Sequence, residues 1–256
     1  MLKYFVKIPI LKRLIPSIGV RLLKLFKKNR GFFVVDGFKM YLDFLDPIDR
    51  IIIINQSYEY EEIDTLNRLI NKNSIKKFID IGANCGFYSF KFARQDLKVL
   101  SFEPNLEAFF KMQKTLEINK KLKNKIKIYP YGISNANSVM QMRSMIKHGY
   151  IQTGGSWVID KKIEKDDKFK VYDANFKKGD DVLKFQNDKI AIKIDVEGHE
   201  LSVLHGIRNL LINNKCILQV EIFERNFEEI NLYLANNNFN LIDHYSKRFN
   251  YFYSNF

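Results

Sequence analysis

The fold of this chain is decided by one stretch of its sequence, Lys76-Lys77-Phe78-Ile79-Asp80-Ile81-Gly82-Ala83-Asn84-Cys85-Gly86-Phe87-Tyr88-Ser89. Its apolar run, residues 78–81, is typical of a parallel strand that is buried on both faces and therefore has no polar side. A Gly-x-x-x-Gly turn and a helical pattern follow. In an open α/β sheet, ligands bind at the carboxyl ends of the strands, so this turn is the first candidate binding site.

The glycine turn distinguishes between two kinds of cofactor. The dinucleotide fingerprint Gly-x-Gly-x-x-Gly requires glycine where this chain has Asn84 and Phe87. Without the second glycine, the backbone crowds a pyrophosphate. Asp80 can accept hydrogen bonds from a cationic ligand, and glycines let the backbone approach it. The spacing favours an S-adenosylmethionine site over a dinucleotide site.

Strands and helices alternate after this turn, which predicts an α/β fold with a doubly wound, mostly parallel sheet. The expected strands are 78–81, 98–102, 126–129, 189–195 and 216–222, and the expected helices are 87–94, 105–118, 199–212 and 226–236. A last pair of strands, 239–243 and 251–253, is expected to close the sheet. An insertion at about 136–176 interrupts the alternation and contains Thr153-Gly154-Gly155-Ser156-Trp157. Trp157 and these glycines fit either a lid over a sugar or an ordinary surface loop.

Residues 1–56 are expected to form an extension of the main domain, residues 57–256. Residues 31–44 predict a β-hairpin, because Asp36-Gly37 suits a two-residue turn with positive φ. Helical spacing follows at 59–70. The first 30 residues carry nine Lys and Arg and no acid, which is most of the net charge of +13.

The basic arm has no uninterrupted apolar run near the ~20 residues of a membrane-spanning helix. Lysines also interrupt the apolar region that a signal peptide requires. Pro9 and Pro16 are expected to divide the arm into short helices. Two interpretations fit it, a peripheral contact with an anionic membrane surface and a helical cap on the main domain, and the cap is favoured.

Two cysteines, Cys85 and Cys216, are too few and too scattered for a disulfide framework or a zinc site. They predict a reducing, cytoplasmic location. The 256 residues, 46% of them apolar, suffice for one α/β domain with a sizeable core.

A second site is predicted at Glu103. It follows the strand 98–102 at ~20 residues from the glycine turn, where such folds place an acid on ribose hydroxyls. In a purely structural interpretation, Glu103-Pro104-Asn105 is a turn between a strand and a helix and includes a capping residue.

A third site is predicted at Asp195-Val196-Glu197-Gly198-His199-Glu200. The strand before it delivers Asp195 to the same edge of the sheet. A zinc-protease helix is excluded because Val203 stands where the second histidine would be needed. Taken singly, His199 is more often a solvated residue of a first helical turn than a base.

At these blocks the chain resembles the FkbM-type methyltransferases, which use S-adenosylmethionine and mostly methylate hydroxyl groups of sugars or natural products. The resemblance spans roughly residues 57–224. It rests on Phe78-Ile79-Asp80-Ile81-Gly82-Ala83-Asn84-Cys85-Gly86-Phe87-Tyr88-Ser89, on Phe102-Glu103-Pro104, on Ile192-Lys193-Ile194-Asp195-Val196-Glu197-Gly198-His199-Glu200, and on Val203-Leu204-His205-Gly206 and Val220-Glu221-Ile222.

The resemblance implies a Rossmann-like class I methyltransferase fold with a closing antiparallel strand, to which the sequence adds the basic N-terminal helical extension. It implies S-adenosylmethionine as cofactor, its methionine end on the glycine turn and its ribose on Glu103. The expected cofactor-binding residues are Asp80, Gly82, Ala83, Asn84, Gly86, Tyr88, Glu103, Pro104 and Gly132. One departure is that Tyr129-Pro130-Tyr131-Gly132 lacks the acid often found at the adenine in the wider superfamily.

The expected catalytic residues are Asp195, His199 and Glu197. Asp195 is expected to orient the acceptor or bind the cofactor, and His199 to act as the base, with Glu197 and Glu221 as helpers. A divalent cation on Asp195 and Glu221 suits carboxylate oxygens, although no metal ligand is assigned.

The expected acceptor is a hydroxyl on a sugar, a glycan, a glycolipid or a related small molecule. An Asp-Pro-Pro-Tyr motif for base nitrogens is absent, since Val196-Glu197-Gly198 takes its place. A nucleic-acid substrate is therefore not expected, although the basic arm keeps an RNA-directed enzyme as an alternative. The other alternative is a non-catalytic binding module on the same fold.

Overall fold

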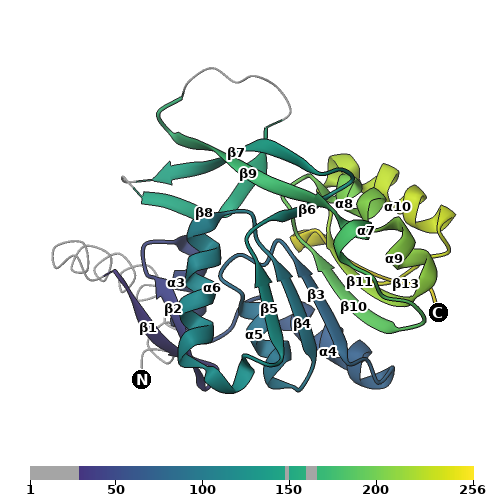
Figure 1. The fold of residues 1–256 in the computed structure, drawn as a ribbon, viewed down its shortest axis with the longest axis horizontal. Helices are drawn as coiled ribbons and strands as arrows, with labels where there is room; N and C mark the ends of the chain where they lie inside the picture. The colour runs from purple at the N-terminus through teal and green to yellow at the C-terminus, as the bar shows by residue number, and fades with distance from the viewer. Residues whose placement is uncertain (1–28, 148–149, 160–165) are drawn as a thin grey trace.

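The computed structural model describes residues 29–147, 150–159 and 166–256 (Figure 1). The predictions for the basic arm fall on residues 1–28, which lie outside this part of the chain. Among the helices of the described ranges, none is both long enough and apolar enough to cross a membrane.

A seven-stranded sheet forms the centre of the molecule, in the order β12-β13-β11-β10-β3-β4-β5. Five strands run parallel, and β13 lies antiparallel between β11 and β12. The chain winds outward from β3 to β5 and returns on the other side of β3, so the strand order reverses between β3 and β10. Their bounds are β3 Lys77–Ile81, β4 Lys98–Phe102, β5 Ile126–Tyr129, β10 Lys189–Ile194, β11 Lys215–Glu221, β12 Asn240–Tyr245 and β13 Asn250–Ser254.

The predicted α/β fold with a mostly parallel sheet is confirmed. Each of the five parallel strands begins and ends within one residue of its expected bounds. The agreement has a physical cause, because these strands are covered on both faces. Phe78 packs into one hydrophobic core and Ile79 into the other, so apolar residues occupy both faces of the strand.

Helices cover both faces of the sheet (Figure 1). On one face lie α4 (Tyr60–Lys72), α5 (Phe87–Arg94) and α6 (Leu106–Ile118), and on the other α8 (Glu200–Gly206), α9 (Arg208–Asn213) and α10 (Phe227–Asn236). The shorter elements are α3 (Pro47–Asn55), α7 (Gly179–Val182), η1 (Lys120–Leu122), η2 (Glu224–Asn226) and η3 (Ser246–Arg248).

One helical prediction needs correction, and one further helix was not predicted. The helix expected at 199–212 is two helices, α8 and α9, separated at Ile207. Gly206 ends α8 against the backbone of Ser134, where an added Cβ would lie 1.9 Å from the carbonyl oxygen. The unpredicted helix is α3, which the sequence pattern did not indicate. Asp46 caps it by accepting hydrogen bonds from the backbone of Ile48 and Asp49.

The predicted hairpin is confirmed as β1 (Arg30–Val35) and β2 (Phe38–Asp43). Asp36 and Gly37 form its turn with φ of 47° and 76°. The hairpin packs beside α6, where the backbone N–H of Tyr41 donates to Thr115 Oγ1 at 2.9 Å.

The insertion folds as a second sheet of four strands, in the order β6-β9-β7-β8. Its strands are β6 (Gly132–Ser134), β7 (Ser138–Lys147), β8 (Tyr150–Val158) and β9 (Phe169–Lys178). Figure 1 shows this insertion sheet beyond the ends of the central strands β3, β4 and β5. Val139 and Val171 lie exposed on it, so the strands are half solvated and show no continuous apolar run.

A buried charge network joins the insertion sheet to the rest of the domain. Lys111 of α6 donates to Asp49 Oδ2 of α3 at 2.7 Å and to Thr153 Oγ1 of β8 at 2.9 Å. Asp46 Oδ2 accepts the backbone N–H of Thr153 at 2.8 Å. Burial raises the pKa of Asp49 to about 6, and Lys111 opposes this increase. Although burial alone would lower it, the pKa of Lys111 is raised by the carboxylates of Asp49 and Asp46.

Replacing Lys111 with methionine is expected to destabilise the protein by about 3–5 kcal/mol, because it leaves Asp49 buried without its cation. Lys114→Met is the matched control on the exposed side of α6. It removes only a cation–π contact with Tyr41 and should cost at most about 1 kcal/mol. Urea unfolding of both variants measures the difference, and equal losses would contradict the network's importance.

Candidate active site

One pocket at the carboxyl ends of β3, β4 and β10 collects most of the predicted site residues. It encloses about 1000 Å³, counting its open mouth. Eight of the nine predicted cofactor-binding residues and all three predicted catalytic residues line it, namely Asp80, Gly82, Ala83, Asn84, Tyr88, Glu103, Pro104, Gly132, Asp195, Glu197 and His199.

Gly86 is the predicted residue that does not line the pocket. It precedes α5 with a left-handed φ of 82°, and an added Cβ would lie 2.8 Å from Met112 and 2.9 Å from Phe90. The absence of a side chain at Gly86 therefore allows α5 to pack closely on α6.

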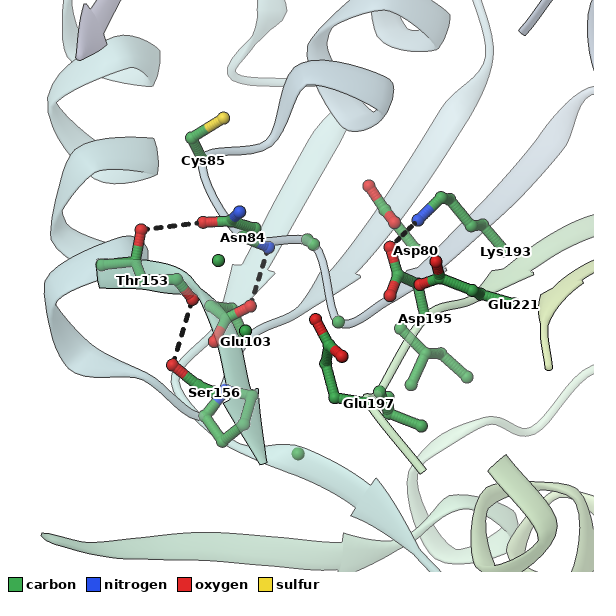
Figure 2. A pocket seen from close by; sticks show the side chains of 18 of the residues that line it. Asp80, Asn84, Cys85, Glu103, Thr153, Ser156, Lys193, Asp195, Glu197 and Glu221 are labelled. Atoms are coloured by element: carbon green, nitrogen blue, oxygen red, sulfur yellow. Dashed lines mark hydrogen bonds and ion pairs between the residues drawn. The ribbon is translucent and has the colours of Figure 1, made fainter. Parts of the chain in front are cut away.

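Figure 2 shows the polar side chains of the pocket in two groups. Asn84, Glu103, Thr153 and Ser156 lie on one side. Asp80, Lys193, Asp195 and Glu221 lie on the other. Glu197 lies between the two groups.

The glycine turn holds its shape through backbone contacts. The N–H groups of Gly82 and Ala83 donate to the carbonyl oxygen of Phe102, at 3.0 and 3.1 Å. Gly82 has a φ of 83°, and an added Cβ would lie 1.8 Å from the carbonyl oxygen of Asp195. Only glycine fits where the ends of β3 and β10 meet so closely.

Glu103 is anchored by two backbone groups. Its Oε2 accepts the N–H of Asn84 at 2.7 Å, and its Oε1 accepts the N–H of Asn105 at 2.8 Å. Each carboxylate oxygen keeps a second lone pair for a ligand hydroxyl. Burial raises the pKa of Glu103 to about 7, although both backbone hydrogen bonds oppose the increase.

Asp80 and Tyr88 reach the pocket but hold other partners. Ser89 Oγ donates to Asp80 Oδ2 at 2.5 Å, and burial raises the pKa of Asp80. The hydroxyl of Tyr88 donates to Glu59 Oε2 at 2.7 Å. Lys193 Nζ lies 4.8 Å from the centre of the Tyr88 ring.

A second group of charges surrounds Lys193. Its Nζ lies 2.5 Å from Asp195 Oδ2, with the Lys193 side chain 5% exposed. Although burial opposes it, Lys193 holds the pKa of Asp195 below its usual range. Burial and the nearby Asp195 raise the pKa of Glu221 to about 11. Of these two neighbouring carboxyl groups, Asp195 is therefore the stronger acid and Glu221 the weaker.

No cluster of three or more His, Cys, Asp or Glu side chains in the described ranges could hold a metal ion. The positive charge beside Asp195 comes from Lys193, since its ammonium group makes the ion pair.

Glu197 and His199 lie on the turn between β10 and α8. Glu197 has a left-handed φ of 54°, and its carboxylate lies beside Gly155 of β8. Burial, and then Asp195, raise the pKa of Glu197 to about 7. His199 Nε2 lies 2.9 Å from Ser134 Oγ, and its ring meets the ring of Phe176 edge to face.

The insertion sheet supplies site residues that sequence reasoning had not assigned. Eight of them line the pocket, namely Ile133, Met142, Thr153, Gly154, Gly155, Ser156, Val158 and Phe176. The Gly154-Gly155 pair was the only available signal. These residues belong to strands, so the segment expected as a lid or a loop is β8. Trp157 does not line the pocket, because it packs against Arg143 and Phe169.

Comparisons with known proteins relate the chain to a family. The model of the methyltransferase FkbM domain matches residues 80–241. The solved structure of methyltransferase FkbM from Methylobacillus flagellatus KT is similar, with a TM-score of 0.48 and 16% identity over 70% of this chain and 43% of that chain. The StiE O-MT is similar with a TM-score of 0.46 and 14% identity over 78% of this chain and 57% of that chain.

M. jannaschii TYW2, solved in complex with AdoMet, is similar with a TM-score of 0.44 and 11% identity over 88% of this chain and 84% of that chain. This chain spans less than two thirds of the FkbM and StiE structures. A search of curated proteins gives no match. The family model covers more than half of the chain, and its matched segment contains the turn, Glu103 and the Asp195 block. The protein belongs to the family defined by the methyltransferase FkbM domain.

Proposed function

We propose that the protein is an S-adenosylmethionine-dependent methyltransferase that methylates a hydroxyl group of a sugar, a glycan or a related small molecule. One observation carries this proposal. A single pocket joins an anchored carboxylate suited to ribose, Glu103, to a separate acidic group around Lys193, with Glu197 between them. Family membership supports methyl transfer as the reaction class.

The residues of the pocket fit the cofactor. The free lone pairs of Glu103 can accept hydrogen bonds from two ribose hydroxyls, and the turn after β3 would hold the methionine end. The apolar lining residues Ile133, Met142 and Phe176 would contact the adenine. Gly132 lies against the Phe176 ring so closely that an added Cβ would be 2.3 Å from it. S-adenosylmethionine supplies an activated methyl group when bound.

The charges of the pocket support a neutral acceptor. Its lining includes the carboxyl groups of Asp80, Glu103, Asp195, Glu197 and Glu221. Lys193 is the one Lys or Arg among the described lining residues, and Asp195 already neutralises it. A phosphate group would face this acidic lining without a cation, so a neutral hydroxyl compound fits better than a nucleic acid.

The protein's main contribution to such a reaction is position. Holding the acceptor oxygen in line with the methyl group can supply ~7–11 kcal/mol of the barrier. The insertion strand β8 closes one side of the pocket with Gly154, Gly155 and Ser156, which helps to exclude water. The glycan or glycolipid partner, the cytoplasmic location and the membrane contact of the arm stay predictions from the sequence.

Glu103→Gln is expected to weaken binding of S-adenosylmethionine and of S-adenosylhomocysteine alike, by about tenfold or more, since a hydrogen bond to a charged group contributes about 1.5–3 kcal/mol. Isothermal calorimetry measures both affinities. The exposed Glu117→Gln on α6 is the control and should bind as the unchanged protein does. Unchanged affinity of Glu103→Gln would remove Glu103 from the cofactor site.

Binding of S-adenosylhomocysteine should also depend on pH. Burial raises the pKa of Glu103 to about 7, so the carboxyl is protonated below pH 7 and must lose its proton to accept both hydroxyls. Affinity is expected to fall by up to about tenfold for each pH unit below 7 and to level off above it. In Glu103→Gln this dependence should disappear, whereas its persistence would assign it to another group.

The acceptor class is tested by incubating the protein with methyl-labelled S-adenosylmethionine and a fractionated cell extract. Label is expected in the neutral glycan, glycolipid or small-molecule fraction. Label in RNA would replace this proposal with an RNA-directed enzyme. Cofactor binding without any transfer of label would support a binding module instead.

A further inference from the structure

We propose that Glu197 is the general base of this site, taking the proton of the acceptor hydroxyl, and that the insertion strand β8 holds its carboxylate in place. This inference rests on the proposed function and names the residue that moves the proton. It gives the insertion sheet a part in the chemistry, beyond closing the pocket.

The backbone at Glu197 is in a conformation that glutamate adopts rarely. Its φ is 54°, and the following Gly198 has a φ of 102°. A left-handed residue other than glycine costs roughly 1–2 kcal/mol and persists only where its surroundings impose it. Glu200 stabilises this turn, since its Oε1 accepts a hydrogen bond from the N–H of Gly198 at 2.8 Å. The result of the turn is a Glu197 side chain that lies in the pocket, between its two polar groups (Figure 2).

The insertion strand contacts the Glu197 carboxylate directly. The backbone N–H of Gly155 lies near it and lowers its pKa, and Gly155 is itself left-handed, with a φ of 77°. An added Cβ on Gly155 would lie 3.9 Å from Glu197 Oε1. The carboxylate is therefore held between the β10–α8 turn and β8, which were brought together by folding.

The charges around Glu197 leave it able to gain and lose a proton near neutral pH. Burial, then Asp195 and Glu200, raise its pKa, while Lys193 and the Gly155 N–H oppose them, giving a pKa of about 7. Arg225 of η2 approaches the neighbouring Gly198, where an added Cβ would lie 3.6 Å from its guanidinium. A general base is most effective when its pKa lies near the operating pH.

The other candidate bases are less suited to accept a proton, because of their partners or their pKa values. Asp195 is paired with Lys193, which keeps its pKa low and makes it a weak base. Glu221 keeps its proton up to about pH 11. His199 directs Nε2 to Ser134 Oγ at 2.9 Å, so that nitrogen already has a protein partner. Asp195 and Glu221 are suited to orienting the acceptor, as acceptor and donor of hydrogen bonds.

In the proposed step, a Glu197 carboxylate oxygen accepts the proton as the acceptor O–H bond breaks. The acceptor oxygen uses its electron pair to form the bond to the methyl carbon. The electrons of the broken sulfur–carbon bond stay on sulfur, so the products are the methyl ether and S-adenosylhomocysteine. The proton then leaves Glu197 for solvent.

Proton release on cofactor binding tests this role without a known acceptor. A sulfonium ion near Glu197 should lower its pKa, whereas neutral S-adenosylhomocysteine should not. Calorimetry at pH 7 in two buffers of different ionisation enthalpy measures the protons released. S-adenosylmethionine is expected to release up to about half a proton more than S-adenosylhomocysteine, because a group with a pKa near 7 is half protonated there. Subtracting the two ligands cancels the contribution of Glu103, which both would engage.

Three variants identify the group that releases the additional proton when S-adenosylmethionine binds. Glu197→Gln should abolish it and keep S-adenosylmethionine affinity within about tenfold, that is, within about 1.4 kcal/mol. His199→Gln and the exposed Glu224→Gln should retain it. A difference that survives in Glu197→Gln, or that disappears in His199→Gln, would overturn the proposal. Should Glu197→Gln not fold, the unchanged protein still decides, because the difference must vanish at pH 9, where Glu197 is already ionised.

Turnover provides the second measurement, with the acceptor fraction that labelling identifies. Glu197→Gln should lower methyl transfer by about 100-fold or more, in the range of general-base catalysis. If methyl transfer falls by less than about tenfold, the role of Glu197 as base is wrong. The proposed function is then unaffected, because cofactor binding does not depend on this role. If the unchanged protein binds neither ligand, the proposed function fails, and the role of Glu197 fails with it.

Discussion

The buried ion pair between Lys111 and Asp49 is the interaction on which the shape of the pocket depends. A buried charge is tolerated only when it is paired and hydrogen-bonded, so Lys111, Asp49, Asp46 and Thr153 must stay together. The four residues come from α6, α3, the loop before it and β8. Thr153 Oγ1 also lies 3.0 Å from Asn84 Oδ1 of the glycine turn. One network therefore ties the extension, the insertion sheet and the predicted cofactor turn to a single geometry.

Burial sets the chemistry of the pocket as well as its shape. Glu103 and Glu197 both have pKa values raised to about 7, chiefly because each is removed from water. They differ in what holds them. Backbone N–H groups of the Rossmann-like core hold Glu103, while the insertion sheet contacts Glu197 through Gly155. The same physical effect thus produces two acids of similar strength with different proposed tasks, one for a ribose and one for a proton.

A sequence prediction succeeded where the feature depends on neighbouring residues, and it failed where the feature depends on a contact between residues far apart in the chain. The strands β3, β4 and β10 were found because burial on both faces makes most of their positions apolar, a local signal. The break at Ile207 was missed because its cause is the contact of Gly206 with Ser134, far away in the sequence. The insertion sheet was missed because its exposed positions, such as Val139 and Val171, obscure the alternation that identifies a strand.

The sequence by itself determined the α/β fold, the hairpin turn, and the placement of Asp80, Glu103 and Asp195 at strand ends, because each depends on residues a few positions apart. Only the tertiary structure decided that Gly86 packs α5 instead of lining the pocket, and that β8 forms one wall of it. It also decided that Lys193 pairs with Asp195 and that Glu197 faces Gly155. These facts depend on groups that meet only when distant segments are brought together, and on the loss of water at that contact, which no local pattern records.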